Sequence, residues 1–129
     1  MKIKKQNKSL IFLIIILAAV IVALMVYWVR YTSAPGQLDS FAKCLDAKGA
    51  KMYGAFWCPH CQAQKALFGK SKNLIPYIEC STADRQQTEI CKTEKIESYP
   101  TWKFATGTDF ISGEKTLKEL SEKTGCELK

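Results

Sequence analysis

The hydrophobic pattern is dominated by one uninterrupted apolar segment near the N-terminus. Residues 10–29 form twenty consecutive positions without a charge, and a helix that rises about 1.5 Å per residue needs about 20 residues to cross a hydrocarbon core of about 30 Å. Tyr27, Trp28 and Tyr31 gather at its far end, where aromatic rings favour the membrane–water interface. We therefore predict a single transmembrane signal-anchor helix at residues 10–29. A cleaved secretory signal is the alternative, although Ser33-Ala34 offers only a weak cleavage site.

Charge is distributed unevenly about this helix. Residues 1–9 carry four lysines, which by the positive-inside rule should stay cytoplasmic and leave the C-terminal part outside, in a periplasm, at the cell exterior or in a thylakoid-type lumen. The net charge of the whole chain is +7, and these four lysines and Arg30 flank the helix. The rest of the chain carries the other fourteen of the nineteen basic residues and all twelve acidic residues. The folded part is therefore nearly neutral, and no nucleic-acid partner is predicted.

Beyond a short linker at residues 30–37, the pattern at 38–129 changes to short apolar segments separated by polar ones. Asp39 or Ser40 can cap a first helix, whose apolar positions recur at helical spacing up to Gly49. The predicted elements after it are a strand at 52–57, a helix closed near Gly69, a strand at 76–80, a polar helix at 84–95, strands at 101–104 and 109–111 joined by a hairpin turn at Thr106-Gly107, and a last helix at 117–125. Strands that alternate with helices and end in a hairpin and a helix imply an α/β domain with a mixed sheet and helices on both faces.

The chemistry of the domain is concentrated where the first strand meets the following helix, at Cys58-Pro59-His60-Cys61. Cys58 takes the helix N-cap, Pro59 suits the first turn because its missing N–H would have no helical partner there, and Cys61 is third in the helix. Residues three apart lie on one helical face about 5–6 Å apart, within disulfide reach. The free N–H groups of a helix N-terminus favour the thiolate of Cys58, which is the nucleophile of thiol–disulfide exchange. We predict that Cys58 is exposed and attacks, whereas Cys61 is shielded and resolves the mixed disulfide.

His60, the only histidine of the chain, lies between the two cysteines. A cationic imidazole beside the sulfur would favour the Cys58 thiolate further. Because a disulfide whose reduced form is stabilised is a strong oxidant, the motif favours the donation of disulfides to other proteins.

Two non-catalytic interpretations of the cysteine pair remain. A structural zinc site takes four ligands, and the chain has no second Cys-x-x-Cys and no second histidine to complete the set. A purely structural disulfide would not require Pro-His between its cysteines at the start of a helix. We therefore favour redox catalysis and predict neither a metal nor a cofactor.

The motif and two later segments carry a family resemblance. Phe56–Cys61, with Tyr99-Pro100-Thr101 further along the chain, resembles the thioredoxin superfamily, and Pro-His between the cysteines is similar to the periplasmic oxidants of the DsbA type. Residues 49–61, with 77–80 and 99–102, resemble more closely still the thioredoxin-like domain that is fused to bacterial and plant vitamin K epoxide reductase homologues.

This resemblance covers residues 38–126 and implies a thioredoxin-like fold, preceded here by the transmembrane helix. It also implies that Tyr99-Pro100 is a cis-proline site facing the cysteines and that, with Trp57, it forms a groove for client polypeptides. The implied function is disulfide formation in exported proteins, with electrons passed to a membrane quinone reductase of the vitamin K epoxide reductase type. The helical-bundle domain of that reductase is missing from this sequence, so a separate partner would be required.

One position departs from the superfamily pattern. The acidic residue that thioredoxins bury six positions before the first cysteine is Met52 here. Without that proton acceptor for the second cysteine, oxidation or isomerisation of clients fits the sequence better than their reduction.

Four further cysteines lie outside the motif. Cys80 ends a predicted strand and Cys91 lies on the following helix, so the two could meet as a second disulfide, with buried free thiols as the alternative. The resemblance suggests a cysteine pair at this place, either structural or electron-relaying. Cys44 shares a helical face with Phe41 and is predicted to be core rather than reactive. Cys126 has no assignable partner, and a Cys44–Cys126 bridge does not follow from the sequence.

Three functions are therefore compatible with the sequence. The first is a membrane-anchored oxidase or isomerase of protein disulfides. The second is a thiol–disulfide reductase, as in cytochrome c maturation, which would have a more negative redox potential. The third is a non-catalytic tether or metallochaperone that holds copper or zinc on Cys58 and Cys61, and metal stoichiometry under reducing conditions would identify it.

Overall fold

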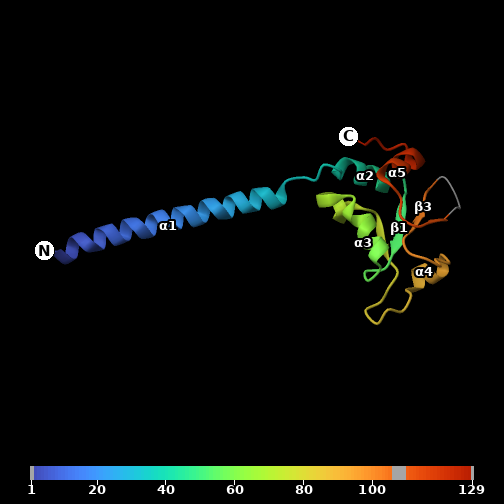
Figure 1. Ribbon diagram of the computed structural model, residues 1–129, viewed down its shortest axis with the longest axis horizontal. Coiled ribbons are helices and arrows are strands. Elements are labelled where there is room, and N and C mark those ends of the chain that lie inside the picture. Colours follow the sequence, from blue (N-terminus) through green and yellow to red (C-terminus); the bar gives the residue numbers. More distant parts are fainter. Residues whose placement is uncertain (1, 106–109, 129) are drawn as a thin grey trace. The chain divides into compact units, whose positions relative to one another are not determined.

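The computed structural model describes residues 2–105 and 110–128, and within them the side chains from residue 7 onward. The chain divides into two compact units, residues 1–34 and 35–129. The first unit is a single helix, α1 (Lys2–Ser33), which is drawn in blue in Figure 1.

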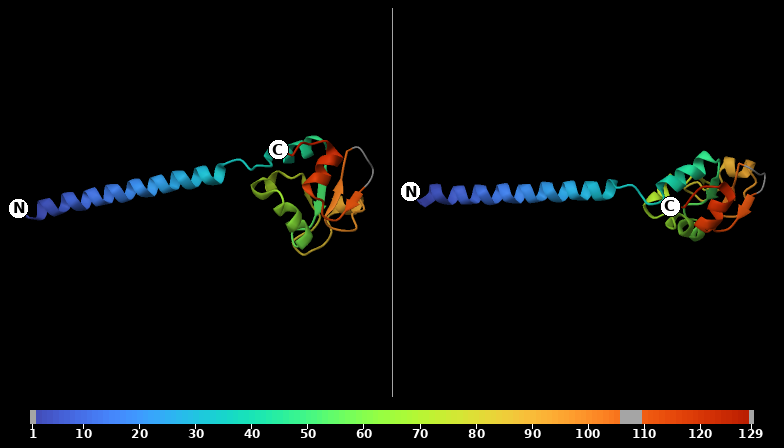
Figure 2. Two further views of the ribbon diagram at one scale, coloured as in Figure 1. Left: turned by 45° about the horizontal axis from the view of Figure 1, so that its top comes forward. Right: turned by 90° about the horizontal axis from the view of Figure 1, so that it is seen from above.

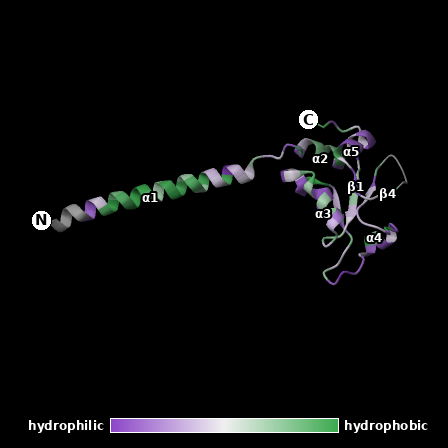
Figure 3. Ribbon diagram, in the orientation of Figure 1, coloured by the Kyte–Doolittle hydropathy of each residue, from purple (hydrophilic) through white to green (hydrophobic). Residues whose placement is uncertain are grey.

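α1 is longer than the predicted segment at 10–29, because the chain contains neither proline nor glycine before Pro35-Gly36. An 18-residue window within its segment Asn7–Ser33 has a mean hydropathy of 3.3, and Figure 3 shows the hydrophobic colour over the middle of the helix. By length and composition this segment is able to cross a membrane, and a secretory signal of similar length would meet the same criterion.

The second unit is built on a four-stranded mixed sheet in the order β2-β1-β3-β4. Its strands are β1 (Lys51–Gly54), β2 (Tyr77–Glu79), β3 (Thr101–Lys103) and β4 (Phe110–Ser112). β1 runs parallel to β2, with Gly54 opposite Glu79, whereas β1 with β3 and β3 with β4 are antiparallel. The predicted mixed sheet is thereby confirmed. Asp109 and the predicted turn at Thr106-Gly107 lie outside the described residues.

Helices cover both faces of this sheet (Figure 1, Figure 2). They are α2 (Asp39–Ala47), α3 (Pro59–Ala66), the 3₁₀ helix η1 (Gly69–Leu74), α4 (Glu89–Thr93) and α5 (Leu117–Thr124). Neighbouring strand residues point to opposite faces. Met52 accordingly packs in the larger core, with side chains of α2, α3 and α5, whereas Tyr53 packs in a smaller core with Cys91 of α4 and with Ile96. The arrangement confirms the predicted α/β fold behind an apolar helix.

Two disulfides reinforce the second unit. Cys44 of α2 is bonded to Cys126, which follows α5, with their Cα atoms 5.9 Å apart. Cys80 is bonded to Cys91 of α4, with their Cα atoms 5.5 Å apart. The first bond links the beginning of the unit to its end, and the second links the end of β2 to the smaller core.

The N-terminal boundary of α2 differs from the prediction. Leu38 is the N-cap, and Asp39 is already helical. The carboxylate of Asp39 instead accepts a hydrogen bond from the hydroxyl of Ser71 at 2.6 Å, so its capping capacity is used between α2 and η1.

β1 is shorter than the predicted strand at 52–57. It ends at Gly54, because the chain turns and the N–H of Cys58 donates to the carbonyl of Ala55 at 3.0 Å. Phe56 and the residue after it therefore lie in the turn and are exposed, instead of being covered on both faces of a sheet.

The predicted polar helix at 84–95 is reduced to the five residues of α4. Thr82 starts a tight loop before it: its carbonyl accepts a hydrogen bond from the N–H of Arg85, and its hydroxyl accepts one from the N–H of Gln86. Arg85 has a φ of 62°, which ends any helical course here. Threonine side chains that bond the local backbone compete with helix formation, and here the loop is favoured.

Candidate redox site

α3 begins at the position that the sequence predicts. Cys58 is the N-cap, with φ −77° and ψ 119°, and Pro59 is the first helical residue. The carbonyl of Cys58 accepts a hydrogen bond from the N–H of Gln62 at 3.1 Å, so the N–H groups of the turn between them are not used by the helix. The positive end of the helix dipole therefore lies at the Cys58 sulfur.

Cys58 and Cys61 are free thiols, and both are buried, with exposed fractions of 5% and 1%. The Cys58 thiol donates a hydrogen bond to the carbonyl of Tyr99 at 3.6 Å, and the Tyr99-Pro100 peptide bond is cis. The fold thus brings Tyr99 and Pro100 to the cysteines from far along the chain. The predicted exposure of Cys58 is wrong for the reduced chain, because the Tyr99 carbonyl and the larger core cover its sulfur.

Burial controls the acidity of Cys61. Its removal from water raises the pKa of this thiol to about 12, although a hydrogen bond with the backbone of Ala55 acts in the opposite direction. Cys61 is therefore protonated at neutral pH, and it must lose this proton before it can act as a nucleophile.

The ring of His60 faces Glu114 and solvent. Its Nδ1 atom lies 2.7 Å from Oε1 of Glu114, in the connection between β4 and α5, and the His60 side chain is 70% exposed. The influence of His60 on the Cys58 thiolate stays a prediction. It now involves a carboxylate that offsets the charge of an imidazolium.

Gln64 holds the connection that carries Glu114. Its buried side chain donates to the carbonyl of Lys115 at 2.9 Å and accepts from the N–H of Lys115 at 2.6 Å. It also accepts from Nε1 of Trp102 at 3.4 Å. Sequence reasoning missed this residue, because a glutamine on a helix carries no signal of burial.

An aromatic surface lies beside the cysteines. Trp57 is 40% exposed, and its ring centroid is 6.2 Å from that of Tyr99 in an edge-on arrangement. Its Nε1 atom donates to the hydroxyl of Ser81 at 2.8 Å, and the guanidinium carbon of Arg85 lies 6.0 Å from its ring centroid. The structure therefore brings together Trp57, Tyr99 and Pro100, which the sequence assigned to the client groove. It adds Arg85, which was missed because its loop was predicted to be a helix.

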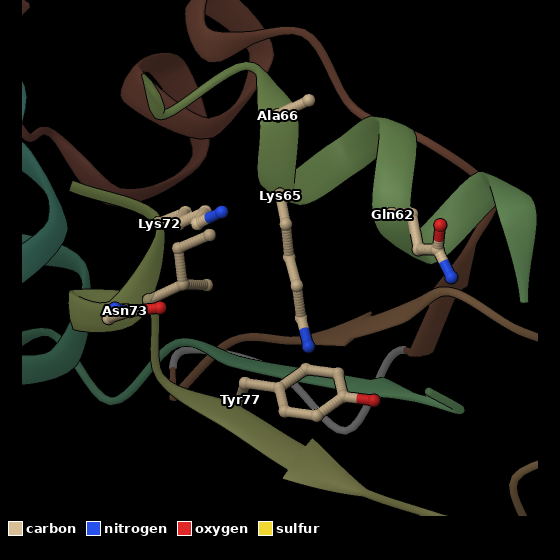
Figure 4. Close-up of a pocket in the computed structure, with 7 residues that line it drawn as sticks. Gln62, Lys65, Ala66, Lys72, Asn73 and Tyr77 are labelled. Atoms are coloured by element: carbon tan, nitrogen blue, oxygen red, sulfur yellow. The ribbon is translucent and has the colours of Figure 1, made fainter. Parts of the chain in front are cut away.

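A polar cluster lies between α3 and β2, and sequence reasoning missed it. Nζ of Lys65 is 3.1 Å from the centroid of the Tyr77 ring, onto which it points in Figure 4. The Tyr77 hydroxyl donates to Glu79 at 2.9 Å. The other carboxylate oxygen of Glu79 accepts from the N–H groups of Phe56 at 3.1 Å and Ser81 at 3.0 Å. We refer to Lys65, Tyr77 and Glu79 as the α3–β2 cluster.

Within residues 7–105 and 110–128, no group of three or more histidine, cysteine, aspartate or glutamate side chains is placed to hold a metal ion. Cys58 and Cys61 offer two sulfur ligands, whereas a structural zinc site takes four ligands. Two buried thiols at a helix N-terminus are instead suited to forming and breaking a disulfide.

Comparisons with known proteins agree with this chemistry. No family model matches the chain. The chain is 43% identical over 94 residues to the thiol-disulfide oxidoreductase LTO1 of Arabidopsis thaliana, a match that covers 69% of this chain and 24% of the relative. It is 30% identical over 98 residues to a protein disulfide-isomerase of Humicola insolens, a match that covers 70% of this chain and 18% of the relative. The matched part thus spans less than a quarter of the length of both relatives. Together with the fold, the two relatives support a place in the thioredoxin-like superfamily and a thiol–disulfide oxidoreductase activity.

Proposed function

We propose that this chain is a membrane-anchored protein thiol–disulfide oxidoreductase that forms or isomerises disulfides in exported proteins. The observation that carries the proposal is the geometry of the free cysteine pair. Cys58 caps α3 and lies against the Tyr99 carbonyl, while Cys61 is buried behind it. Such a pair can store a disulfide and give it to another protein.

Oxidation of a client proceeds in two exchanges. A client thiolate attacks Sγ of Cys58, the Cys58–Cys61 bond breaks, and its electron pair stays on Cys61, which then takes up a proton. A second client thiolate attacks the client sulfur of the mixed disulfide and releases Cys58 as a thiolate. The client has lost two electrons and gained a disulfide, and the protein has become a dithiol. Isomerisation begins from the dithiol, when the Cys58 thiolate attacks a wrong client disulfide.

The client is proposed to bind along Trp57 and Tyr99, beside the buried ring of Pro100. Pro100 has no N–H to donate, and the exposed ring of Trp57 offers a contact for apolar client side chains. An extended client would pair with the backbone before Pro100, which gives affinity without strict sequence preference. Arg85, above the Trp57 ring, would favour clients with acidic residues near the reacting cysteine.

The membrane assignment is also a proposal. α1 would act as the anchor, with residues 1–9 in the cytoplasm and residues 38–129 in the periplasm, at the cell exterior or in a thylakoid-type lumen. A reporter that is active only in the cytoplasm should be inactive when fused to the C-terminus. Activity of that fusion would refute the orientation.

A membrane quinone reductase of the vitamin K epoxide reductase type is the proposed electron partner. The support is the resemblance of residues 49–61, 77–80 and 99–102 to the thioredoxin-like domain that accompanies such reductases. The partner would reoxidise Cys58 and Cys61 by the same exchange, with its own cysteines taking the two electrons.

Oxidative refolding of a reduced client tests the function. The full chain, purified in detergent and oxidised at Cys58 and Cys61, is mixed with reduced, unfolded ribonuclease A, and ribonuclease activity is followed. We expect activity to return faster than in buffer alone, and not to do so with Cys58→Ser. Failure of the wild-type chain to transfer its disulfide would refute the proposal. A redox potential as negative as that of thioredoxin would instead favour the reductase function.

A further inference from the structure

Cys61 has to exchange a proton in every catalytic cycle, and the position from which thioredoxins offer an acid is occupied by Met52. Burial raises the pKa of its thiol to about 12, so the thiol does not ionise readily in neutral water. Met52, which stands where thioredoxins bury an acid, is itself completely buried and has no group that accepts a proton. Another part of the structure must carry the proton.

We propose that the α3–β2 cluster transfers the proton of Cys61, with Tyr77 as the group beside the sulfur and Glu79 as the acceptor. This inference rests on the proposed function, because it describes how the same cysteine pair completes its reaction.

Gly54 brings the thiol and the cluster together. A Cβ atom at Gly54 would lie 2.7 Å from Sγ of Cys61 and 2.9 Å from Cε2 of Tyr77, so both groups close over the bare glycine backbone. Cε2 neighbours the ring carbon that bears the hydroxyl. The edge of the Tyr77 ring next to the hydroxyl-bearing carbon therefore shares the space over Gly54 with the Cys61 sulfur.

The hydrogen bonds of the cluster define the direction of transfer. The Tyr77 hydroxyl already donates to Glu79 at 2.9 Å, and its oxygen remains able to accept a proton. Burial raises the pKa of Tyr77, and the bond to Glu79 raises it further, so the phenol passes one proton on as it takes up another and is not left ionised. The two N–H groups that bind the other oxygen of Glu79 fix the carboxylate in place.

Lys65 acts as a positioning residue. Its ammonium group lies 3.1 Å above the Tyr77 ring, where a cation is attracted by the ring face. Burial lowers the pKa of Lys65, whereas Glu79 and Cys61 act in the opposite direction. The Lys65 charge therefore interacts with both the Glu79 carboxylate and the Cys61 sulfur. This charge would stabilise the Cys61 thiolate while the proton is on Glu79.

Lys65 and Tyr77 of the cluster also line a pocket that is open to water. A pocket of about 610 Å³ is lined by Lys65 and Tyr77 together with Lys72 and Asn73 (Figure 4). Lys72 of η1 lines the same pocket, and the Cys58 thiol is a further titratable group that influences the pKa of Tyr77. Water in the pocket can return the proton to solvent after each turnover.

The step in which Cys61 resolves a mixed disulfide on Cys58 is balanced as follows. Cys61 gives its proton to the Tyr77 oxygen while the Tyr77 hydroxyl proton moves to Glu79. The Cys61 sulfur then attacks Sγ of Cys58, the new sulfur–sulfur bond forms, and the bond from Cys58 to the client breaks. The client leaves as a thiolate that holds the electron pair. The first exchange in the oxidation of a client is the reverse of this step.

Rapid-quench mass spectrometry can follow this closure directly. The reduced full chain in detergent is mixed with glutathione disulfide, and acid stops the reaction. The glutathione adduct on Cys58 and the closed disulfide are then counted over time. We expect Tyr77→Phe and Glu79→Gln to form the adduct at the wild-type rate but to close at least about tenfold more slowly near neutral pH. As the pH rises, the Cys61 thiolate fraction grows about tenfold per unit without help, so this defect should shrink.

Matched variants separate a proton path from a structural role. Glu94→Gln removes a carboxylate that pairs with Lys103 at 2.6 Å elsewhere in the fold, and it should close at the wild-type rate. Lys65→Met should slow closure, whereas Lys65→Arg keeps a cation over the ring and should restore most of the rate.

The outcomes are distinguishable. Wild-type closure rates in Tyr77→Phe and Glu79→Gln would overturn the inference. A defect of equal size at every pH would also overturn it, because a misplaced Cys61 would be slow at all pH values. If the wild-type chain forms no adduct on Cys58, the proposed function fails instead.

Discussion

His60 is paired with Glu114, whose Oε1 atom lies 2.7 Å from the imidazole Nδ1, across a separation of 54 residues. The histidine of the active-site motif thus has a carboxylate partner from the connection between β4 and α5. The charge that the motif presents to Cys58 is therefore the sum of two side chains rather than that of the imidazole alone.

The redox potential should respond to both members of this pair. We expect His60→Ala to make the disulfide harder to reduce and Glu114→Gln to make it easier to reduce, because the first removes a cation near the Cys58 thiolate and the second removes an anion. Each shift should stay below about 30 mV, which corresponds to about 1.4 kcal/mol, because the pair is exposed to solvent. Glutathione titrations read through Trp57 fluorescence measure it. An unchanged potential in both variants would mean that the helix terminus alone sets it.

The two cysteines should play unequal roles. A Cys61→Ser variant should accumulate mixed disulfides with clients through Cys58, because the resolving thiol is lost while the N-cap sulfur remains. A Cys58→Ser variant should accumulate few, since Cys61 is 1% exposed and protonated at neutral pH. Non-reducing gels after acid trapping show the adducts. More adducts with Cys58→Ser than with Cys61→Ser would reverse the assignment.

The reduced chain should lose stability in alkaline solution. The raised pKa means that the folded state holds the Cys61 proton more tightly than the unfolded state does. This stabilisation is complete below the usual pKa near 9.0 and is lost as the pH rises through the folded value of about 12. The free energy of unfolding of the reduced chain should therefore fall in this window.

Urea unfolding at a series of pH values, with a phosphine as reductant, measures the alkaline loss. Burial also raises the pKa values of Tyr53 and Tyr77, so the whole chain loses some stability there in either redox state. The matched control is Cys61→Ala, which keeps both tyrosines. Parallel curves for this variant and the reduced wild-type chain would contradict the role of Cys61.

The two disulfides should differ in their contribution to stability. The Cys44–Cys126 bond closes a separation of 82 residues and the Cys80–Cys91 bond one of 11. In the chain-entropy model these loops correspond to about 4.5 and about 3 kcal/mol. Thermal unfolding, with Cys58 and Cys61 reduced, compares the variant that replaces Cys44 and Cys126 by alanine with the variant that replaces Cys80 and Cys91. The free energy of unfolding should fall further in the variant without the Cys44–Cys126 bond. A larger loss for the second would indicate that α4 depends on its disulfide beyond loop closure.

Local spacing made the centre of the site predictable. Proline after Cys58 and the three-residue interval to Cys61 specify a helix start and a shared face within four residues, and the structure has α3 starting there. The alternation of apolar segments likewise predicts the mixed sheet, since each strand signal is contained in a few neighbouring residues.

The parts that sequence reasoning missed depend on contacts between distant segments. The partners His60 and Glu114 are 54 positions apart in the sequence, and Cys44 and Cys126 are 82 apart, so no local pattern pairs them. The loop around Arg85 was missed for a different reason. Its residues are compatible with a helix, and the hydrogen bonds of Thr82 select the loop instead.

Few residue types can replace Gln64 of α3 without loss of its hydrogen bonds. Its amide donates a hydrogen bond to the Lys115 carbonyl and accepts one from the Lys115 N–H, and its side chain is fully buried. Glutamate has the reach but no proton to give when ionised, asparagine has both groups but is one methylene shorter, and leucine or methionine would leave two backbone groups of Lys115 without partners. A library randomised at position 64 and sorted for folded, active molecules should therefore return glutamine almost alone.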